Sequence, residues 1–145
     1  MKIYDSQKNK ILNVAKTRKT KAEWAKILSL EQYQITTEQG TEEPFTCTFA
    51  ENKEPGLYRC IRCGTDLFRN ETKYDSETGW PSYYEPVSDL NIRLEPDTSL
   101  GRYRTEVLCA RCDAHLGHVF DDGPPPTGKR YCMNSAALKF IRQTT

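Results

Sequence analysis

The sequence predicts a single, mainly β domain with antiparallel strands and short helices near its N-terminus. Its 145 residues suffice for one domain, because a domain near this size buries about 68–70% of its unfolded surface. Beyond Gly40, proline and glycine interrupt β-branched and aromatic residues at short intervals, as in antiparallel β domains. We divide the chain into a basic N-terminal arm, residues 1–21, and one domain, residues 22–145.

The N-terminal third is expected to hold the arm and two short helices. Residues 1–21 contain seven basic residues and one acidic residue, which indicates a flexible, solvated arm rather than a contact with an acidic partner. From Ala22 onward, Trp24 and Ile27 have helical spacing. Ser29, followed by Glu31 and Gln32, resembles the capped start of a second helix through residue 34.

Strands are expected in the remainder of the chain. The candidates are residues 46–49, 56–60, 92–95, 103–109, 118–120 and 130–134. Residues 96–101 are predicted to form a turn, and residues 121–128, with three consecutive prolines, a stiff loop. Residues 136–141 form a closing segment whose type the pattern leaves open.

Charge and hydropathy exclude several classes of protein. The formal net charge is +1 and the pI about 7.6, which argues against nucleic acid as the partner. The mean hydropathy is −0.76 and no apolar run approaches the roughly 20 residues of a membrane span. The N-terminus lacks an apolar leader, so we expect a cytoplasmic protein whose six cysteines serve metal or redox chemistry rather than disulfides.

Four of the cysteines form two C-x-x-C turns, Cys60–Cys63 and Cys109–Cys112, each after a predicted strand. Two such turns can converge on one tetrahedral Zn²⁺, and a closed shell of four sulfurs is typical of a structural site. The alternatives are free thiols, a redox pair or an iron–sulfur centre, and His115 or His118 could replace a cysteine ligand. We favour one structural Zn²⁺ that joins distant parts of the sheet.

A fifth cysteine is the candidate nucleophile. In residues 130–134, strand alternation places Arg130, Cys132 and Asn134 on one face. A thiol attacks as its thiolate, and we expect the nearby guanidinium to favour that form at neutral pH. The alternative is that Cys132 is a small buried apolar residue.

Two further segments suggest a site. Both histidines of the chain, His115 and His118, lie three residues apart, close to Asp122 and upstream of Cys132. They could serve as a proton donor and its orienting partner, although a single histidine is usually structural. Trp80 lies in a Gly–Trp–Pro context, where it could be core or form an apolar wall of a shallow pocket.

Together these residues resemble the methionine-R-sulfoxide reductases. The resemblance covers roughly residues 27–141 and depends on G-W-P-S-aromatic at 79–83, H-L-G-H-V-F-x-D-G-P at 115–124 and R-Y-C-x-N at 130–134. It implies two antiparallel sheets in a tent-like arrangement, with zinc on the side opposite the active face. It also implies a monomer that acts on oxidised proteins containing methionine sulfoxide and is recycled by a thioredoxin-like reductant.

The resemblance also implies a role for each site residue. Cys132 would attack the sulfoxide sulfur while His118, helped by His115, protonates the departing oxygen. Arg130 and Asp122 would tune the thiolate and position the imidazoles. Asn134 would hold a histidine or a water molecule, and Trp80 would pack against the methyl group of the substrate.

One departure from the family concerns recycling. Many members carry a resolving cysteine directly before Gly-Trp-Pro, where this chain has Thr78. Cys47 is the remaining thiol and is our candidate for the resolving role. A non-enzymatic zinc-ribbon binding module, with Trp80, Tyr83 and Tyr84 as stacking surfaces, is the alternative function, but it leaves the Cys132 face unexplained.

Overall fold

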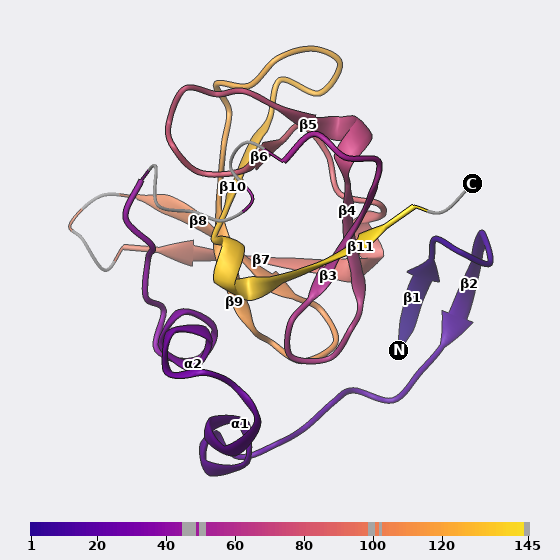
Figure 1. The fold of residues 1–145 in the computed structure, drawn as a ribbon, viewed down its shortest axis with the longest axis vertical. Helices are drawn as coiled ribbons and strands as arrows, with labels where there is room; N and C mark the ends of the chain where they lie inside the picture. Colours follow the sequence, from indigo (N-terminus) through magenta and orange to yellow (C-terminus); the bar gives the residue numbers. More distant parts are fainter. Residues whose placement is uncertain (45–48, 50–51, 99–100, 102, 144–145) are drawn as a thin grey trace.

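The computed structural model describes residues 1–44, 49, 52–98, 101 and 103–143. It contains three antiparallel sheets and two helices (Figure 1). In chain order the elements are β1 (Lys2–Asp5), β2 (Lys10–Asn13), α1 (Lys21–Ile27), α2 (Leu30–Thr37), β3 (Gly56–Cys60), β4 (Asp66–Arg69), β5 (Lys73–Tyr74), β6 (Ser82–Tyr83), β7 (Ile92–Asp97), β8 (Arg104–Cys109), β9 (His115–Phe120), β10 (Arg130–Met133) and β11 (Leu138–Arg142). The expected mainly β fold with antiparallel sheets and short N-terminal helices is confirmed.

Two sheets face each other across an aromatic core. One has six strands in the order β5-β6-β10-β9-β8-β7, and the other has three in the order β11-β3-β4. Phe68 of β4 stacks on Tyr83 of β6 with ring centroids 4.5 Å apart, and Tyr58 of β3 meets Tyr83 edge-on at 5.3 Å. All three rings are fully buried. Each such ring pair contributes about 0.5–1.5 kcal/mol beyond area burial, so these contacts help to hold the two sheets together.

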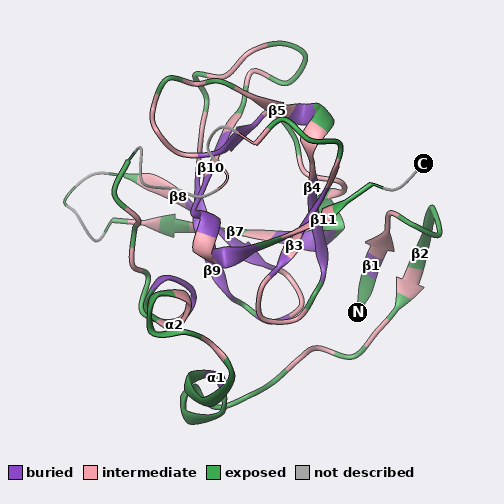
Figure 2. Ribbon diagram, in the orientation of Figure 1, coloured by how far each residue is buried: buried purple, intermediate pink, exposed green. Residues whose placement is uncertain are grey.

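Both helices begin with a capping box. The side chains of Thr20 and Ser29 accept from the backbone N–H groups of Glu23 and Gln32, respectively. In return, the side chains of Glu23 and Gln32 accept from the backbone N–H groups of the two cap residues. The second helix therefore starts where the sequence predicts, although it continues to Thr37. Trp24 of α1 is 1% exposed. Most of α1 is otherwise exposed, in contrast to the mostly buried strands β3, β4 and β9 (Figure 2).

The N-terminal segment differs from the expected flexible arm. Residues 2–13 form the β1–β2 hairpin, and Ile3 is buried. Buried Asn91 accepts from the backbone N–H of Tyr4 at 2.8 Å and donates to its carbonyl at 2.9 Å, as a paired strand would. Asp66 accepts from the N–H of Ser6 at 2.7 Å. The sequence prediction failed because these partners lie more than 50 positions away.

Several strands from residue 56 onward agree with the predicted positions. The strand predicted at residues 56–60 coincides with β3. The strand predicted from residue 92 continues to Asp97, and the one predicted at residues 118–120 begins at His115. Strands β4, β5 and β6 were not predicted. The closing segment is a 3₁₀ turn, Ser135–Ala137, followed by β11, and most of the strand predicted at residues 46–49 lies outside the described residues.

No helix within the described residues is both long enough and apolar enough to cross a membrane.

Candidate active site and cysteine cluster

The candidate nucleophile and one histidine are direct cross-strand neighbours. In the antiparallel pairing of β10 with β9, Cys132 lies opposite His118, and in the pairing of β8 with β9, His118 lies opposite Glu106. Opposed residues in an antiparallel pair project from the same face, with Cβ atoms about 4.5–5.5 Å apart. The sheet therefore presents a carboxylate, an imidazole and a thiol in one row.

A β-bulge adds the second histidine to this face. Val107 pairs with Gly117 but Leu108 pairs with His115, so β9 has one extra residue, Leu116. Without the extra residue, positions 115 and 118 would lie on opposite faces of the strand. The two imidazole centroids are 5.4 Å apart in an edge-to-face arrangement. A Cβ at Gly117 would lie 2.1 Å from the Cys132 carbonyl oxygen, so only glycine permits this close approach of β9 and β10.

Asn134 holds the bulge instead of a histidine ring. Its backbone N–H and its Nδ2 both donate to the carbonyl of Leu116, at 2.9 and 3.1 Å. Its Oδ1 accepts from the backbone N–H of Glu42 at 3.0 Å, and the Glu42 carbonyl accepts from Trp80 Nε1 at 2.9 Å. The structure thus connects the bulge and Trp80 through one asparagine.

Each imidazole binds a carboxylate that the sequence analysis missed. His115 Nδ1 lies 2.7 Å from Glu106 Oε2, and His118 Nε2 lies 2.7 Å from Asp97 Oδ2. Glu106 is only 5% exposed. Glu106 is the first residue of the buried half of β8, and the one charged side chain beside Val107 and Leu108 was a usable signal, because buried carboxylates need a partner.

Asp122 does not take the expected place beside the imidazoles. Its carboxylate accepts from Arg130 Nε at 2.9 Å and Nη2 at 3.2 Å. The Arg130 guanidinium also lies 4.3 Å from the ring centroid of Phe120. Arg130 lies in β10 itself, two residues before Cys132 and on the same face of the strand.

Burial raises the pKa of the Cys132 thiol to about 11. The charge of Arg130 and hydrogen bonds from the hydroxyls of Thr78 and Ser82 lower it, but by less than burial raises it. The guanidinium acts in the direction that we expected, and it does not by itself make the thiolate the resting form.

A cavity of about 430 Å³ lies at the candidate site. Cys132 and His118 lie in its wall together with the rings of Trp80, Phe120 and Tyr103. An apolar cavity with a few convergent polar groups is the usual form of a small-molecule or side-chain site. His115 is 2% exposed and does not line the cavity. Cys47, our candidate resolving thiol, lies outside the described residues.

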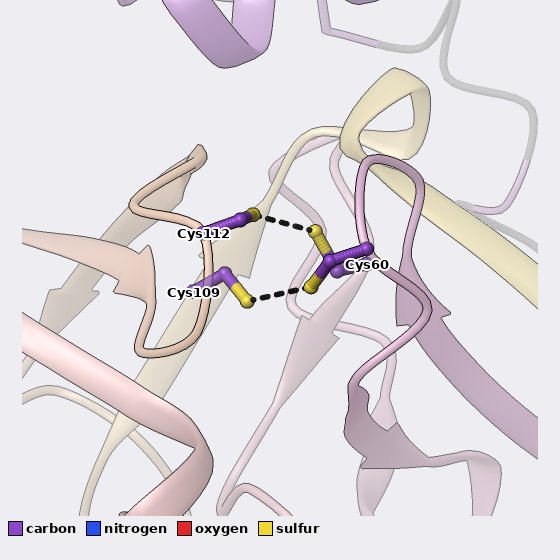
Figure 3. Close-up of side chains that lie close together, drawn as sticks. Cys60, Cys109 and Cys112 are labelled. Carbon is purple, nitrogen blue, oxygen red and sulfur yellow. Dashed lines mark hydrogen bonds between the residues drawn. The ribbon is translucent and has the colours of Figure 1, made fainter. Parts of the chain in front are cut away.

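The four remaining cysteines come together as predicted (Figure 3). Their sulfurs all lie within 4.8 Å of one another, with Cys60 and Cys112 at 3.5 Å and Cys63 and Cys109 at 3.5 Å. Sulfurs around a tetrahedral Zn²⁺ with bonds of about 2.3 Å would be about 3.8 Å apart. The cluster therefore fits one metal ion with four sulfur ligands.

The two C-x-x-C turns have the same local structure. In each, the residue after the second cysteine donates its N–H to the carbonyl of the first cysteine at 2.9 Å. That residue has positive φ, 78° at Gly64 and 63° at Asp113. Arg62 of the first turn donates to the Cys112 carbonyl at 3.1 Å, so the turns are also joined outside the sulfurs.

Comparisons with known proteins agree with this geometry. The SelR domain matches residues 28–142. The chain is 52% identical to peptide methionine sulfoxide reductase MsrB of Methanosarcina barkeri and 54% identical to that of Hahella chejuensis, over 84% and 86% of its length and 86% and 90% of theirs. It is 58% identical to peptide methionine sulfoxide reductase B1, chloroplastic, of Oryza sativa subsp. japonica, over 85% of this chain and only 58% of that protein.

A solved structure shares part of the fold. The Mis18 'Yippee-like' domain superposes with a TM-score of 0.51 and 17% sequence identity, over 63% of this chain and all of that one. At this identity the likeness concerns the fold alone.

Proposed function

The chain belongs to the methionine-R-sulfoxide reductase B family, and from this premise we propose that it reduces the R epimer of methionine sulfoxide in oxidised proteins to methionine. The observation that carries the proposal is the register of β9 and β10, which sets Cys132 opposite His118 in the wall of one cavity. A zinc-ribbon binding module would not require a thiol and an imidazole to face each other there.

The resting thiol and its histidine neighbour suggest the course of the reaction. Because the pKa of Cys132 is about 11, its proton must be removed before attack, and His118 is the adjacent acceptor. The thiolate attacks the sulfoxide sulfur, and His118 returns the proton to the departing oxygen. The oxygen moves to Cys132 as sulfenic acid while the substrate sulfur gains two electrons and leaves as methionine.

Two further residues, Arg130 and Trp80, assist the reaction without transferring a proton. Arg130, paired with Asp122, favours the anionic sulfur, since a cation stabilises a thiolate. Trp80, held through its Nε1 by the Glu42 carbonyl, offers an apolar ring to the methyl group of the substrate. Asn134 supports the histidine strand through its bond to Leu116, and supports Trp80 through its bond to Glu42.

The sulfenic acid must then be reduced by a thiol. A thiol attacks the Cys132 sulfur, water leaves, and a second thiol cleaves the resulting disulfide. We propose Cys47 as the first thiol and a thioredoxin-like dithiol as the second. Peptide mapping after oxidation by substrate should find a Cys47–Cys132 bridge. If Cys47→Ser turns over normally with thioredoxin, the first thiol comes from outside the chain.

The cysteine cluster supports one structural zinc ion. Cys60, Cys63, Cys109 and Cys112 would hold Zn²⁺, which with four sulfur ligands keeps no open position for substrate. The ion would join the end of β3 to the end of β8.

We further propose that the protein acts as a cytoplasmic monomer.

Turnover of the two separated epimers of a peptide containing methionine sulfoxide tests the proposed function. We expect the R epimer to be reduced with dithiothreitol as reductant and the S epimer to remain. The chloroplastic relative is much longer than this chain, so the assay should use this chain alone. Reduction of neither epimer, or of the S epimer, would contradict the proposal.

A further inference from the structure

Glu106 and His115 form a buried pair on the same face of the sheet as His118 and Cys132. The two side chains are 5% and 2% exposed, and Oε2 lies 2.7 Å from Nδ1. His118 is held by its other nitrogen, Nε2, through Asp97. The carboxylates therefore bind different ring nitrogens in the two histidines. The nitrogen that binds no carboxylate is Nε2 in His115 and Nδ1 in His118.

We propose that Glu106 is a positioning residue that fixes His115 as the Nδ1–H tautomer, so that its Nε2 serves the reaction only as a hydrogen-bond acceptor. This inference deepens the proposed function, on which it rests for the identity of the reaction. It assigns a role to a carboxylate that touches no reacting atom.

The tautomer follows from the chemistry of the pair. An ionised carboxylate can only accept, so the proton between the two groups belongs to Nδ1. Burial lowers the pKa of His115 by more than the negative charge of Glu106 raises it, so the ring holds one proton at neutral pH. Nε2 then keeps a lone pair. It is buried and has no hydrogen-bond partner among the described residues, which marks it as an acceptor that awaits a donor.

The consequence is a division of labour between the histidines. His115 cannot supply a proton from Nε2, so His118, which lines the cavity, is left as the donor. Because His115 does not line the cavity, its Nε2 can accept a hydrogen bond only from a hydroxyl group or a water molecule that reaches it from there.

Gln39 binds the Glu106 carboxylate that holds His115 and donates a hydrogen bond to it. Its Nε2 lies 3.2 and 3.1 Å from the two oxygens of Glu106. Only the nitrogen of a carboxamide can donate to a carboxylate. Gln39 also has φ 57°, an unusual conformation for a residue other than glycine.

This geometry predicts an informative substitution. In Glu106→Gln the new carboxamide keeps its oxygen toward Gln39 Nε2 and turns its NH₂ toward His115 Nδ1. His115 must then accept at Nδ1 and carry its proton on Nε2. In the double variant Q39E/E106Q, the carboxylate introduced at position 39 accepts from that NH₂ and returns the carboxamide oxygen to His115, which restores the Nδ1–H tautomer.

Long-range ¹H–¹⁵N NMR reads both tautomers directly, because the chain contains only two histidines. We expect Nδ1–H at His115 in the wild type, Nε2–H in E106Q and Nδ1–H again in Q39E/E106Q, with a variant lacking His118 to assign the signals. With R-sulfoxide substrate, kcat of E106Q should fall at least about ten-fold, with recovery in the double variant.

Glu95→Gln is the matched control, because Glu95 lies opposite Glu106 in the β7–β8 pairing but its carboxylate binds Arg93. It should leave the tautomers and kcat unchanged. An Nε2–H ring in the wild type, or an unchanged His115 spectrum in E106Q, would overturn the proposal. The NMR result does not depend on turnover, so it remains decisive even if the proposed activity fails.

Discussion

Asn134 donates two hydrogen bonds to a single carbonyl, that of Leu116, which is the extra residue of the β9 bulge. The bulge is what turns His115 onto the face of His118. The same carboxamide accepts from the N–H of Glu42, whose carbonyl binds Trp80. A change at Asn134 therefore reaches both a histidine and the apolar wall of the cavity.

Asn134→Ala should lower both stability and rate. The change leaves the Glu42 N–H without its acceptor and removes one donor to Leu116 in a buried position, which costs about 1–3 kcal/mol. Urea unfolding measures this loss, and kcat should fall as the bulge relaxes. Asn13→Ala, at an exposed position of β2, is the control and should change neither quantity. A stable, fully active Asn134→Ala protein would show that the bulge needs no support.

Cys132→Ser should abolish reduction and leave the fold intact. A serine hydroxyl is close in size to the thiol but is not ionised at neutral pH, so it cannot replace the nucleophile. Activity on the R epimer and the melting temperature should be measured together. Activity within a few-fold of wild type would exclude Cys132 as the nucleophile.

The two histidines should differ in the cost of their removal. His118→Ala should lose about 10²–10⁴-fold in kcat, because it removes the proton donor that faces Cys132. His115→Ala should lose less, because the remaining donor stays in place. If His118→Ala loses less than ten-fold while His115→Ala loses more, the two assignments must be exchanged.

The sequence identified the candidate site residues but not the carboxylates and the register that position them. Strand alternation was enough to put Arg130 and Cys132 on one face, and the paired C-x-x-C turns were enough to bring four sulfurs together. Glu106 and Asp97 could not be assigned to their histidines, because that requires the β7–β8–β9 register. A bulge shifts the register by one residue, and neighbouring residues alone do not reveal it.

The same limit explains the errors in the fold. The short strand β6 pairs only two residues with β10, which is too little for a sequence pattern to show. The hairpin at the N-terminus depends on Asn91, whose side chain substitutes for a backbone strand partner. Both depend on contacts between distant positions, whereas the start of α2 depends on its local cap, Ser29, and was predicted.

Alkylation of Cys132 should accelerate with pH well beyond neutrality. Its pKa of about 11 leaves about one thiolate in 10⁴ molecules at pH 7, and the fraction rises about ten-fold per pH unit until that pKa. Mass spectrometry of the Cys132 peptide after iodoacetamide treatment gives the rate at each pH. Arg130→Gln removes a charge that lowers the pKa, so it should slow alkylation at every pH below 11. A rate that reaches its plateau below pH 8 would contradict the burial argument.

Removal of the metal should unfold the protein instead of merely slowing it. The four sulfurs join β3 to β8, and in a closed structural site the binding free energy of the metal is also folding free energy. Elemental analysis should find one zinc per chain, equally in the wild type and in Cys132→Ser, because Cys132 lies outside the cluster. A strong chelator should then lower the melting temperature of both proteins alike, and Cys109→Ser should fail to retain zinc. A metal-free preparation with an unchanged melting temperature and full activity would show that the cluster stabilises the fold as free thiols.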